Sequence, residues 1–326
     1  MPTQLRRFQV VFAKIESAEG TDAVPTATDA LQLVAPADFS WGAYQDNEQD
    51  DKDNQKLESD APLAPSGMWA EIGLRLHIRG KGSAYATTAG PETHALLQGA
   101  LMQESFAASQ WSYDTAQGIA GGQKTLTFYG FKGLDTNVWI LQKILAAKVR
   151  RLSIIGDAHR AGILEVAARG EYVEPTDTAL ISPTYFTSIA PLFRAAGSWS
   201  IGSYATGFVK RASLTLENTL QFRDNANSAA VRHLITGRSL TWDVLVEAAR
   251  VADYNPWNKW SARAQEAITM IFGAAGSNNK LQVDADRAQI IREPVGYEDE
   301  NGLARFRAGG VLDPGGTNRM KLLYTT

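Results

Sequence analysis

The residue types that most often carry catalysis or bind metals are sparse in this chain and stand far apart. The 326 residues include no cysteine and only four histidines, at His77, His94, His159 and His233. No two histidines have the spacing of a zinc site, and without cysteine neither a thiolate nucleophile nor a disulfide can form. We therefore expect no metal, no cofactor and no enzymatic activity.

Two short stretches have the outline of catalytic motifs. In GLRLHIRGKGS, residues 73–83, the glycine and lysine pattern resembles a phosphate-binding loop, but Gly73 stands two positions too early and Gly82 takes the place of the hydroxyl residue. SNNK, residues 277–280, matches a serine–lysine nucleophile motif, but no companion motif follows it. Both stretches are better explained as turns.

The densest group of carboxylates lies in QDNEQDDKDNQKLESD, residues 45–60. Seven carboxylates against two lysines give it a net charge of −5, whereas the whole chain carries −3. Such a stretch cannot bury enough apolar surface to offset its ordering entropy, which predicts an exposed, mobile loop. It could be a solvated loop, an intersubunit contact that orders on assembly, or a calcium site without the glycine and final glutamate of an EF-hand. The acidic residues are Asp46, Glu48, Asp50, Asp51, Asp53, Glu58 and Asp60.

An aromatic cluster and two basic pairs are candidate ligand-binding groups. Trp257 and Trp260, in YNPWNKW, could stack on sugar rings or pack under a following helix, and packing is the favoured interpretation. The pairs Arg150–Arg151 and Lys210–Arg211 are expected on polar strand faces or at subunit contacts.

Alternation of apolar and polar residues predicts strands through most of the chain. The clearest case is 70–80, and similar patterns cover 124–130, 239–248 and 280–286. Short helices are expected at 91–102, which opens at Pro91, and at 261–272, with Ser261 as the N-cap. The segment 138–155 fits neither period, so two strands or one helix remain open. The predicted class is mainly β with a few short helices (α+β).

The order of these elements repeats along the chain. A strand, a helix, a strand and a glycine-punctuated segment occur first at 70–80, 91–102, 124–130 and 162–172, and again at 239–248, 261–272, 280–286 and 302–312. This predicts two similar units, although chance repetition in a β-rich chain remains an alternative. The expected organisation is an N-terminal arm with the first strands at 1–45, the acidic loop at 46–66, one domain at 67–173, a proline-containing connector at 174–200 and a second domain at 201–326.

Composition narrows the classes of partner. With 44% hydrophobic and 21% charged residues the chain should bury a core. A pI near 5.9 and the absence of a basic block argue against sequence-specific nucleic-acid binding. The apolar run near the N-terminus has four residues, too short for a signal peptide, and no stretch of 18 apolar residues occurs, so we expect neither export nor membrane insertion.

The stretch AKIESAEGTDAVPTATDALQLV, residues 13–34, loses its large side chains for about a dozen positions. Lys14, Glu16, Gly20, Asp22 and Pro25 stand in a pattern that resembles the amino-terminal signature of the major tail tube proteins of long-tailed, siphovirus-like bacteriophages. Ala18-Glu19 replaces the threonine–tyrosine usual there. The later order of glycine-rich strand, helix, TLTFYG strand and arginine-flanked strand also resembles the family, so the similarity covers nearly the whole chain.

The resemblance implies a structural virion protein. Tail tube proteins form rings that stack into a hollow tube with a continuous inner β-barrel, through which DNA passes without sequence-specific binding and which encloses the tape-measure protein. Family members with one tube domain form six-membered rings, so two tandem β-sandwich or barrel domains would close as a trimeric ring with pseudo-sixfold symmetry; a hexameric ring is the alternative. Tail-tip and terminator proteins are implied partners, and the location is the virion tail, assembled in the host cytoplasm. The N-terminal arm would reach over a neighbour, and the acidic loop would contact another subunit or ring.

Two other classes remain open on the residues alone. A β-rich carbohydrate-binding module would use exposed tryptophans such as Trp257. A glycosidase-like enzyme would need two carboxylates about 5–10 Å apart in one pocket.

Overall fold

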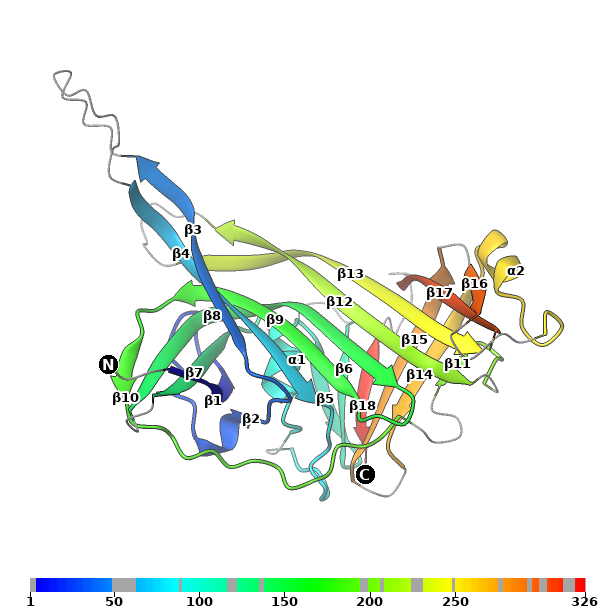
Figure 1. Cartoon of the computed structure of the whole chain (residues 1–326), viewed down its shortest axis with the longest axis horizontal. Coiled ribbons are helices and arrows are strands. Elements are labelled where there is room, and N and C mark those ends of the chain that lie inside the picture. The colour runs from blue at the N-terminus through cyan, green and yellow to red at the C-terminus, as the bar shows by residue number, and fades with distance from the viewer. Residues whose placement is uncertain are drawn as a thin grey trace.

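The structure is a computed structural model of the whole chain, shown in Figure 1. It describes residues 4–48, 63–87, 90–115, 122–134, 138–193, 199–205, 208–223, 231–247, 250–274, 278–291, 295–298, 304–312 and 320–325.

The prediction of a mainly β chain with short helices is confirmed. The first half contains β1 (Gln4–Ile15), β2 (Ala30–Leu31), β3 (Asp38–Glu48), β4 (Leu63–His77), α1 (His94–Gly99), β5 (Gln103–Ala107), β6 (Gln110–Asp114), β7 (Leu126–Leu134), β8 (Trp139–Asp157) and β9 (Ile163–Tyr172). The second half contains β10 (Thr176–Thr178), β11 (Trp199–Ile201), β12 (Val209–Arg223), β13 (Arg232–Glu247), α2 (Pro256–Ser261), β14 (Gln265–Phe272), β15 (Lys280–Ile290), β16 (Val295–Glu298), β17 (Ala304–Leu312) and β18 (Lys321–Thr325).

The pattern of strand pairing in the first half recurs in the second. We call β1, β3, β4, α1, β7, β8 and β9 unit A, and β11, β12, β13, α2, β14, β15, β16 and β17 unit B. Five strand pairings have a counterpart in each unit. In unit A they are β1–β7, β3–β4, β4–β9, β7–β8 and β8–β9. In unit B the counterparts, in the same order, are β11–β14, β12–β13, β13–β17, β14–β15 and the pairing of β17 with both β15 and β16. All are antiparallel.

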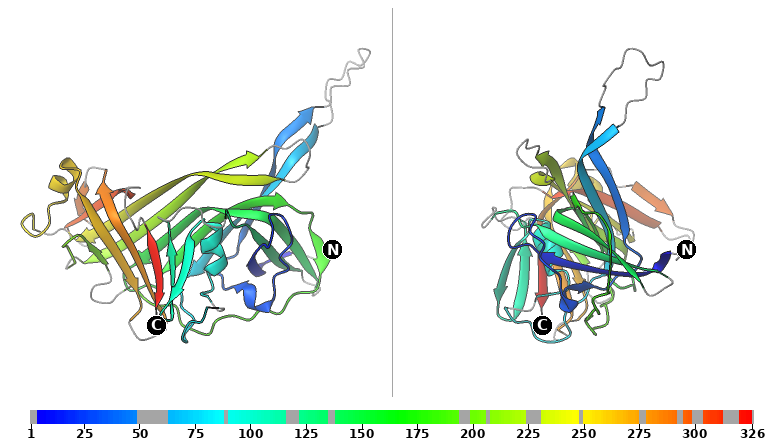
Figure 2. Two further views of the ribbon diagram at one scale, coloured as in Figure 1. Left: turned by 180° about the vertical axis from the view of Figure 1, so that it is seen from behind. Right: turned by 90° about the vertical axis from the view of Figure 1, so that its left-hand side faces the viewer.

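The two units share hydrogen-bonded sheets. The C-terminal half of β8 pairs with β12, and the last strand, β18, pairs with both β15 and β6. Two long hairpins, β3–β4 and β12–β13, extend toward the same end of the molecule, while α2 lies at the opposite end (Figures 1 and 2). One large core cluster contains residues of both units.

The helix predicted over 261–272 is wrong. Residues Gln265–Phe272 form β14, in which Ile268, Met270 and Phe272 are buried at alternate positions. The helix comes earlier, as α2, where the side chain of Asn255 accepts a hydrogen bond from the Asn258 amide at 2.9 Å. Ser261 is therefore the end of a helix and not its N-cap. The helix predicted over 91–102 is present but shorter, as α1.

The ambiguous segment 138–155 is a single strand, β8, of 19 residues. Its register shifts between Leu145 and Lys148 and again between Val149 and Arg151 in its pairing with β9. Ala146 has a positive φ of 49°. Each β-bulge moves the following side chains to the other face, which is why neither a helical nor a strand period fits the sequence.

The predicted acidic loop is shorter at both ends than expected. Residues 46–48 belong to β3 and residues 63–66 to β4, with Glu48 opposite Leu63. Backbone pairing does not depend on side-chain polarity, so the hairpin continues into acidic sequence. Neither helix of the described residues has the length and apolar character needed to cross a bilayer.

Candidate assembly surface

Eight strands form one continuous antiparallel row across both units. Their order is β3, β4, β9, β8, β12, β13, β17 and β16. The two faces of this row differ in polarity, as two neighbouring sets of residues show, each paired directly across successive strands. One set reads Arg75, Glu165, Ser153, Thr215 and Thr241, and the next reads Leu74, Val166, Leu152, Leu216 and Leu240. The second set is buried in the core, so the first belongs to a polar face on the other side.

The polar face carries arginines that are paired with carboxylates on neighbouring strands. Arg169 and Arg150 each approach Glu71 to 2.8 Å, and Arg307 approaches Asp243 to 2.9 Å. Longer pairs, at 3.5–3.8 Å, complete the set: Arg75–Glu165, Arg151–Glu217 and Arg211–Asp157. Ser153 and Thr215 add a hydrogen bond between their hydroxyls at 2.7 Å. Six arginines thus share five carboxylates, so most of the charge on this face is balanced locally. Arg150, Arg151 and Arg211 lie on a polar strand face, as predicted.

The row of eight strands ends in two margins that have no partner strand among the described residues. At one margin β3 pairs with β4 alone, and at the other β16 pairs with β17 alone. Each of the seven steps between them is antiparallel, so β3 and β16 run in opposite directions. Unpaired backbone groups along such margins are sites for pairing with another chain. Two margins of opposite direction can pair with each other between copies in the antiparallel mode.

The amino-terminal motif folds onto its own chain. Glu16, which is buried, accepts hydrogen bonds from the amides of Gly20 at 2.7 Å and Ala146 at 2.8 Å. It also accepts from the hydroxyls of Thr125 at 2.7 Å and Thr127 at 3.0 Å. The carboxylate thus joins β1, the following turn, β7 and β8. Sequence reasoning singled out Glu16 and Gly20 but not Thr125, Thr127 and Ala146, which are more than 100 residues away from Glu16.

Gly20 and Asp22 explain the rest of the motif. Gly20 has a φ of +81°, a conformation that other residues adopt only with strain, and a Cβ there would also displace the guanidinium of Arg232. Asp22 accepts from the Tyr129 hydroxyl at 2.6 Å and from Lys143 at 3.0 Å. Burial by itself would raise the pKa of Asp22, but hydrogen bonds from Tyr129, the Val24 amide and Lys143 lower it below its ordinary value.

The remaining predicted arm residues are also accounted for. Lys14 lies 3.7 Å from Asp29 and donates to the Val24 carbonyl, and Pro25 is buried. Contact of this arm with a neighbouring copy stays a prediction. Of the acidic residues, Asp46 and Glu48 lie in β3, whereas Asp50, Asp51, Asp53, Glu58 and Asp60 lie outside the described residues.

The four histidines are not brought together. His94 meets the Tyr113 hydroxyl at 2.7 Å, and His159 lies in a turn with a φ of 60°. His233 is fully buried and meets the Tyr44 hydroxyl at 2.7 Å. Burial, with the charges of Arg169 and Lys148, lowers the pKa of His233 to about 4. Within the described part of the chain, no three histidine or acidic residues are arranged to hold a metal ion.

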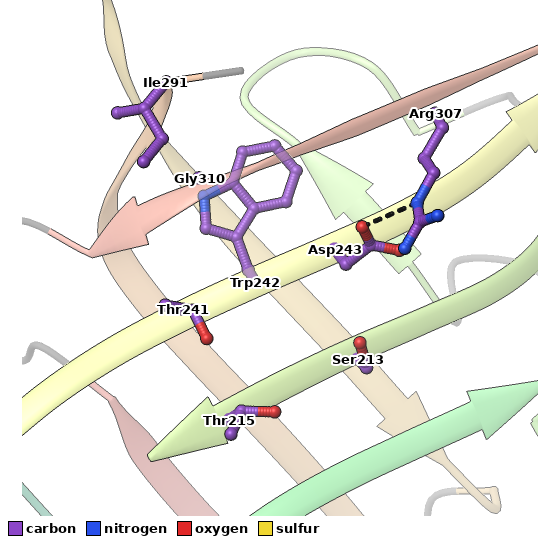
Figure 3. Close-up of a pocket in the computed structure, with 8 residues that line it drawn as sticks. All are labelled: Ser213, Thr215, Thr241, Trp242, Asp243, Ile291, Arg307 and Gly310. Carbon is purple, nitrogen blue, oxygen red and sulfur yellow. Dashed lines mark hydrogen bonds and ion pairs between the residues drawn. The ribbon is translucent and has the colours of Figure 1, made fainter. Parts of the chain in front are cut away.

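Two hollows lie in the surface of unit B. One, of about 200 Å³, lies over β12, β13 and β17 and is lined by eight residues, of which Asp243 is the single carboxylate (Figure 3). Asp243 is paired there with Arg307. The other hollow, of about 380 Å³, adjoins the end of α2 and is lined by Trp260, Ser261, Arg263, Gln289, Ile290 and Ile291. Neither lining offers the two carboxylates that glycoside hydrolysis requires.

The tryptophans lie on α2 itself and not beneath a following helix. Trp257 is 42% exposed and Trp260 is 37% exposed. The interpretation that they are packed under a helix is therefore wrong.

Comparison with known proteins supplies no family for this chain. It matches no protein-family model, and no curated protein is significantly similar to it.

Proposed function

We propose that the chain is a structural subunit that closes with copies of itself into a ring, and that these rings stack into the hollow tail tube of a long-tailed bacteriophage. The observation that carries the proposal is the row of eight strands, which has two unpaired margins of opposite direction and one polar face. A margin of one copy can pair with the other margin of the next copy. Such head-to-tail contacts produce rings when the rotation closes.

The polar face suits the wall of a conduit for DNA. Affinity for a phosphate backbone comes from cations that displace its counterions. Here the six arginines of the polar face named above each have a carboxylate within 4 Å and share five carboxylates, so most of their charge is balanced. A wall of this kind would pass a polyanion without holding it.

The repeated pairing pattern favours three copies in a ring. Within one chain, unit A joins unit B through β8 and β12. If each copy joins the next through an equivalent contact, every ring contains twice as many units as chains. Three chains then give six similar units, which agrees with the six-membered symmetry implied by the resemblance to tail tube proteins.

Electron microscopy of the purified protein over a concentration series tests the proposal. We expect rings and short tubes with a central channel, and three chains per ring in a reconstruction. A protein that stays monomeric at high concentration would overturn the proposed function. Rings of six chains would overturn the stoichiometry alone.

A carbohydrate-binding module is the second candidate, because Trp257 and Trp260 present partly exposed rings on one short helix. It predicts a monomer that binds a glycan and loses that binding in Trp257→Ala. A glycan array probed with the wild type and with Trp257→Ala separates the two proposals. A carbohydrate-binding module should lose its signal in the variant, whereas a tube subunit should give no signal that depends on Trp257.

A further inference from the structure

The junction between unit A and unit B shows which surfaces of one unit are covered by the next unit. The hairpin β12–β13 of unit B pairs through β12 with β8 of unit A, and Asn218 and Arg238 on its core-facing side contact the end of α1. Arg238 donates to the carbonyls of Ala100 at 3.1 Å and Leu101 at 2.6 Å, and Asn218 donates to Ala100 at 3.2 Å. Ala100 is fully buried as a result.

No described residue covers the same helix end in unit B in this way. Ala262 and Arg263 follow α2 as Ala100 and Leu101 follow α1, with matching backbone bonds and positive φ angles of 52° at Arg263 and 62° at Leu101. Ser261, Ala262 and Arg263 are exposed, and the larger of the two hollows lies beside them. The place that β12–β13 fills on unit A is thus open on unit B.

The corresponding hairpin of unit A has an exposed apolar side. Strand pairing places Trp41 of β3 opposite Ala70, as Leu214 of β12 is opposite Trp242, and it aligns Met68 with Leu240. Trp41 is 56% exposed and Met68 is 36% exposed, whereas Leu214 is 1% and Leu240 is 6% exposed. A tryptophan therefore stands uncovered at the position where unit B buries a leucine.

The pairings also define a register for the missing contact. With the glycine-punctuated segments 162–172 and 302–312 aligned, residues 304–307 of β17 correspond to 164–167 of β9, so β16 corresponds to the part of β8 that pairs with β12. In the internal junction Leu216 is opposite Leu152 and Leu214 is opposite Ile154. Their counterparts are Ala43 opposite Gly296 and Trp41 opposite Glu298.

We infer that β3 of one copy pairs antiparallel with β16 of the next copy, with Ala43 opposite Gly296. In the same contact the apolar side of the β3–β4 hairpin, with Trp41 and Met68, covers the exposed end of α2. The partner is a second copy of this chain because the internal junction supplies the template for both surfaces. The inference rests on the self-association in the proposed function and adds its interface.

Disulfide trapping tests the register in a chain that has no cysteine of its own. Ala43→Cys with Gly296→Cys places two thiols on directly opposed residues, the separation a disulfide needs. The neighbouring Gly42 is unsuitable as a cysteine position, because a Cβ there would lie 2.7 Å from the ring of Trp69. Ser153→Cys with Thr215→Cys is the internal control, and Ala43→Cys with Glu298→Cys is the control two residues out of register.

After oxidation of assembled protein, non-reducing gels should show covalent dimers and trimers for the in-register pair. The internal control should form its disulfide without a change in mass, and the out-of-register pair should give at least tenfold less product. Rings in micrographs with no in-register product, or with equal product from the out-of-register pair, would overturn the inference and leave the proposed function standing. A chain that stays monomeric would overturn both.

A second variant covers the case in which the cysteine pair does not fold. Trp41→Ala, which removes a side chain that is exposed in the monomer, should raise the protein concentration needed for rings at least tenfold while the far-UV spectrum of the subunit is unchanged. Unchanged assembly of a folded Trp41→Ala protein would contradict the proposed cover of α2.

Discussion

Ser153 on β8 and Thr215 on β12 face each other across the boundary between the two units, with their hydroxyl oxygens 2.7 Å apart. This contact shows that the units meet by strand pairing and not by loose domain packing. The same row continues to margins at β3 and β16 that have no partner strand among the described residues, so the chain contains an internal example of the contact that we propose between copies.

Leu214 and Trp41 occupy matching positions in the two hairpins and should respond to truncation in opposite ways. Leu214→Ala opens a cavity in the core and should lower the free energy of unfolding of the subunit by about 2–5 kcal/mol. Trp41→Ala should leave that free energy within about 0.5 kcal/mol, because surface substitutions rarely cost more. Urea denaturation at a concentration where the protein is monomeric measures both. A large loss in Trp41→Ala would mean that Trp41 belongs to the fold of the single chain.

Substitution of Glu16 should lower the free energy of unfolding more than substitution of most other polar residues. Glu16→Gln replaces one acceptor oxygen with an NH₂ group that faces donors, which leaves buried donors unpaired. We expect a loss of about 2–3 kcal/mol in the free energy of unfolding. The matched control is Glu217→Gln, whose carboxylate is largely exposed and 3.7 Å from Arg151, with an expected loss below about 1 kcal/mol. Equal effects in the two variants would contradict the role of Glu16 as a buried link.

His233 should make the subunit less stable in mild acid. Its pKa in the fold, about 4, lies below the ordinary value of 6.5, so below pH 6.5 the unfolded chain binds a proton that the folded chain does not. The resulting stability is present above pH 6.5 and is lost as the pH falls toward 4, by up to about 1.4 kcal/mol per pH unit.

Urea denaturation between pH 7 and 4.5 measures this dependence. The control is His233→Gln, which keeps a hydrogen-bond partner for Tyr44 but does not titrate, so its profile should be flatter than that of the wild type. Parallel profiles would show that His233 does not take part in the acid response.

Much of the fold could be predicted from alternation, but its irregular points could not. The strand around Leu74 reads clearly because its apolar residues face a core on one side only. β8 could not be assigned, because its bulges near Ala146 and Val149 interrupt the period and their positions depend on pairing with β9. The helix predicted at Ser261 was wrong because α2 begins at a different cap, Asn255, and ends at Ser261, so that most of the predicted segment is β14.

The assembly surface was less predictable than the fold. Single arginines such as Arg150 and Arg151 could be placed on a polar strand face. Their partners could not be named, because Glu71 is 79 residues from Arg150 and because Glu217 reaches Arg151 only through the pairing of β8 with β12, which no local pattern encodes. The motif around Glu16 was noticed through resemblance, but its hydrogen bonds link it to β7 and β8, which only the folded chain brings near.

The acidic segment should act in stacking and not in ring closure. Because the strands of its hairpin extend to Glu48 and Leu63, residues 49–62 can be replaced by Asn-Gly, a sequence suited to a two-residue hairpin turn. We expect this variant to fold and to form rings, but to give shorter tubes in negative-stain micrographs. Tubes of normal length would show that the acidic residues of this segment are dispensable for stacking.

The charge balance of the polar face should control how DNA interacts with the tube. The triple variant Glu71→Gln, Glu217→Gln and Asp243→Asn removes the partners of Arg169, Arg150, Arg151 and Arg307. Freed cations release counterions from DNA, so binding of a short duplex at about 50 mM salt should tighten at least tenfold and should weaken steeply toward about 200 mM. Fluorescence anisotropy measures the affinity.

The control for this prediction carries the same change in net charge away from the polar face. The control is the triple variant Glu104→Gln, Glu174→Gln and Asp177→Asn. Glu104 lies on β5, Glu174 precedes β10 and Asp177 lies on β10, and all three residues are exposed. If DNA binding follows the location of the arginines, the control should bind as weakly as the wild type. If the two triple variants bind equally well, net charge alone sets the affinity and the arginine–carboxylate pairs of the polar face have no special part in it.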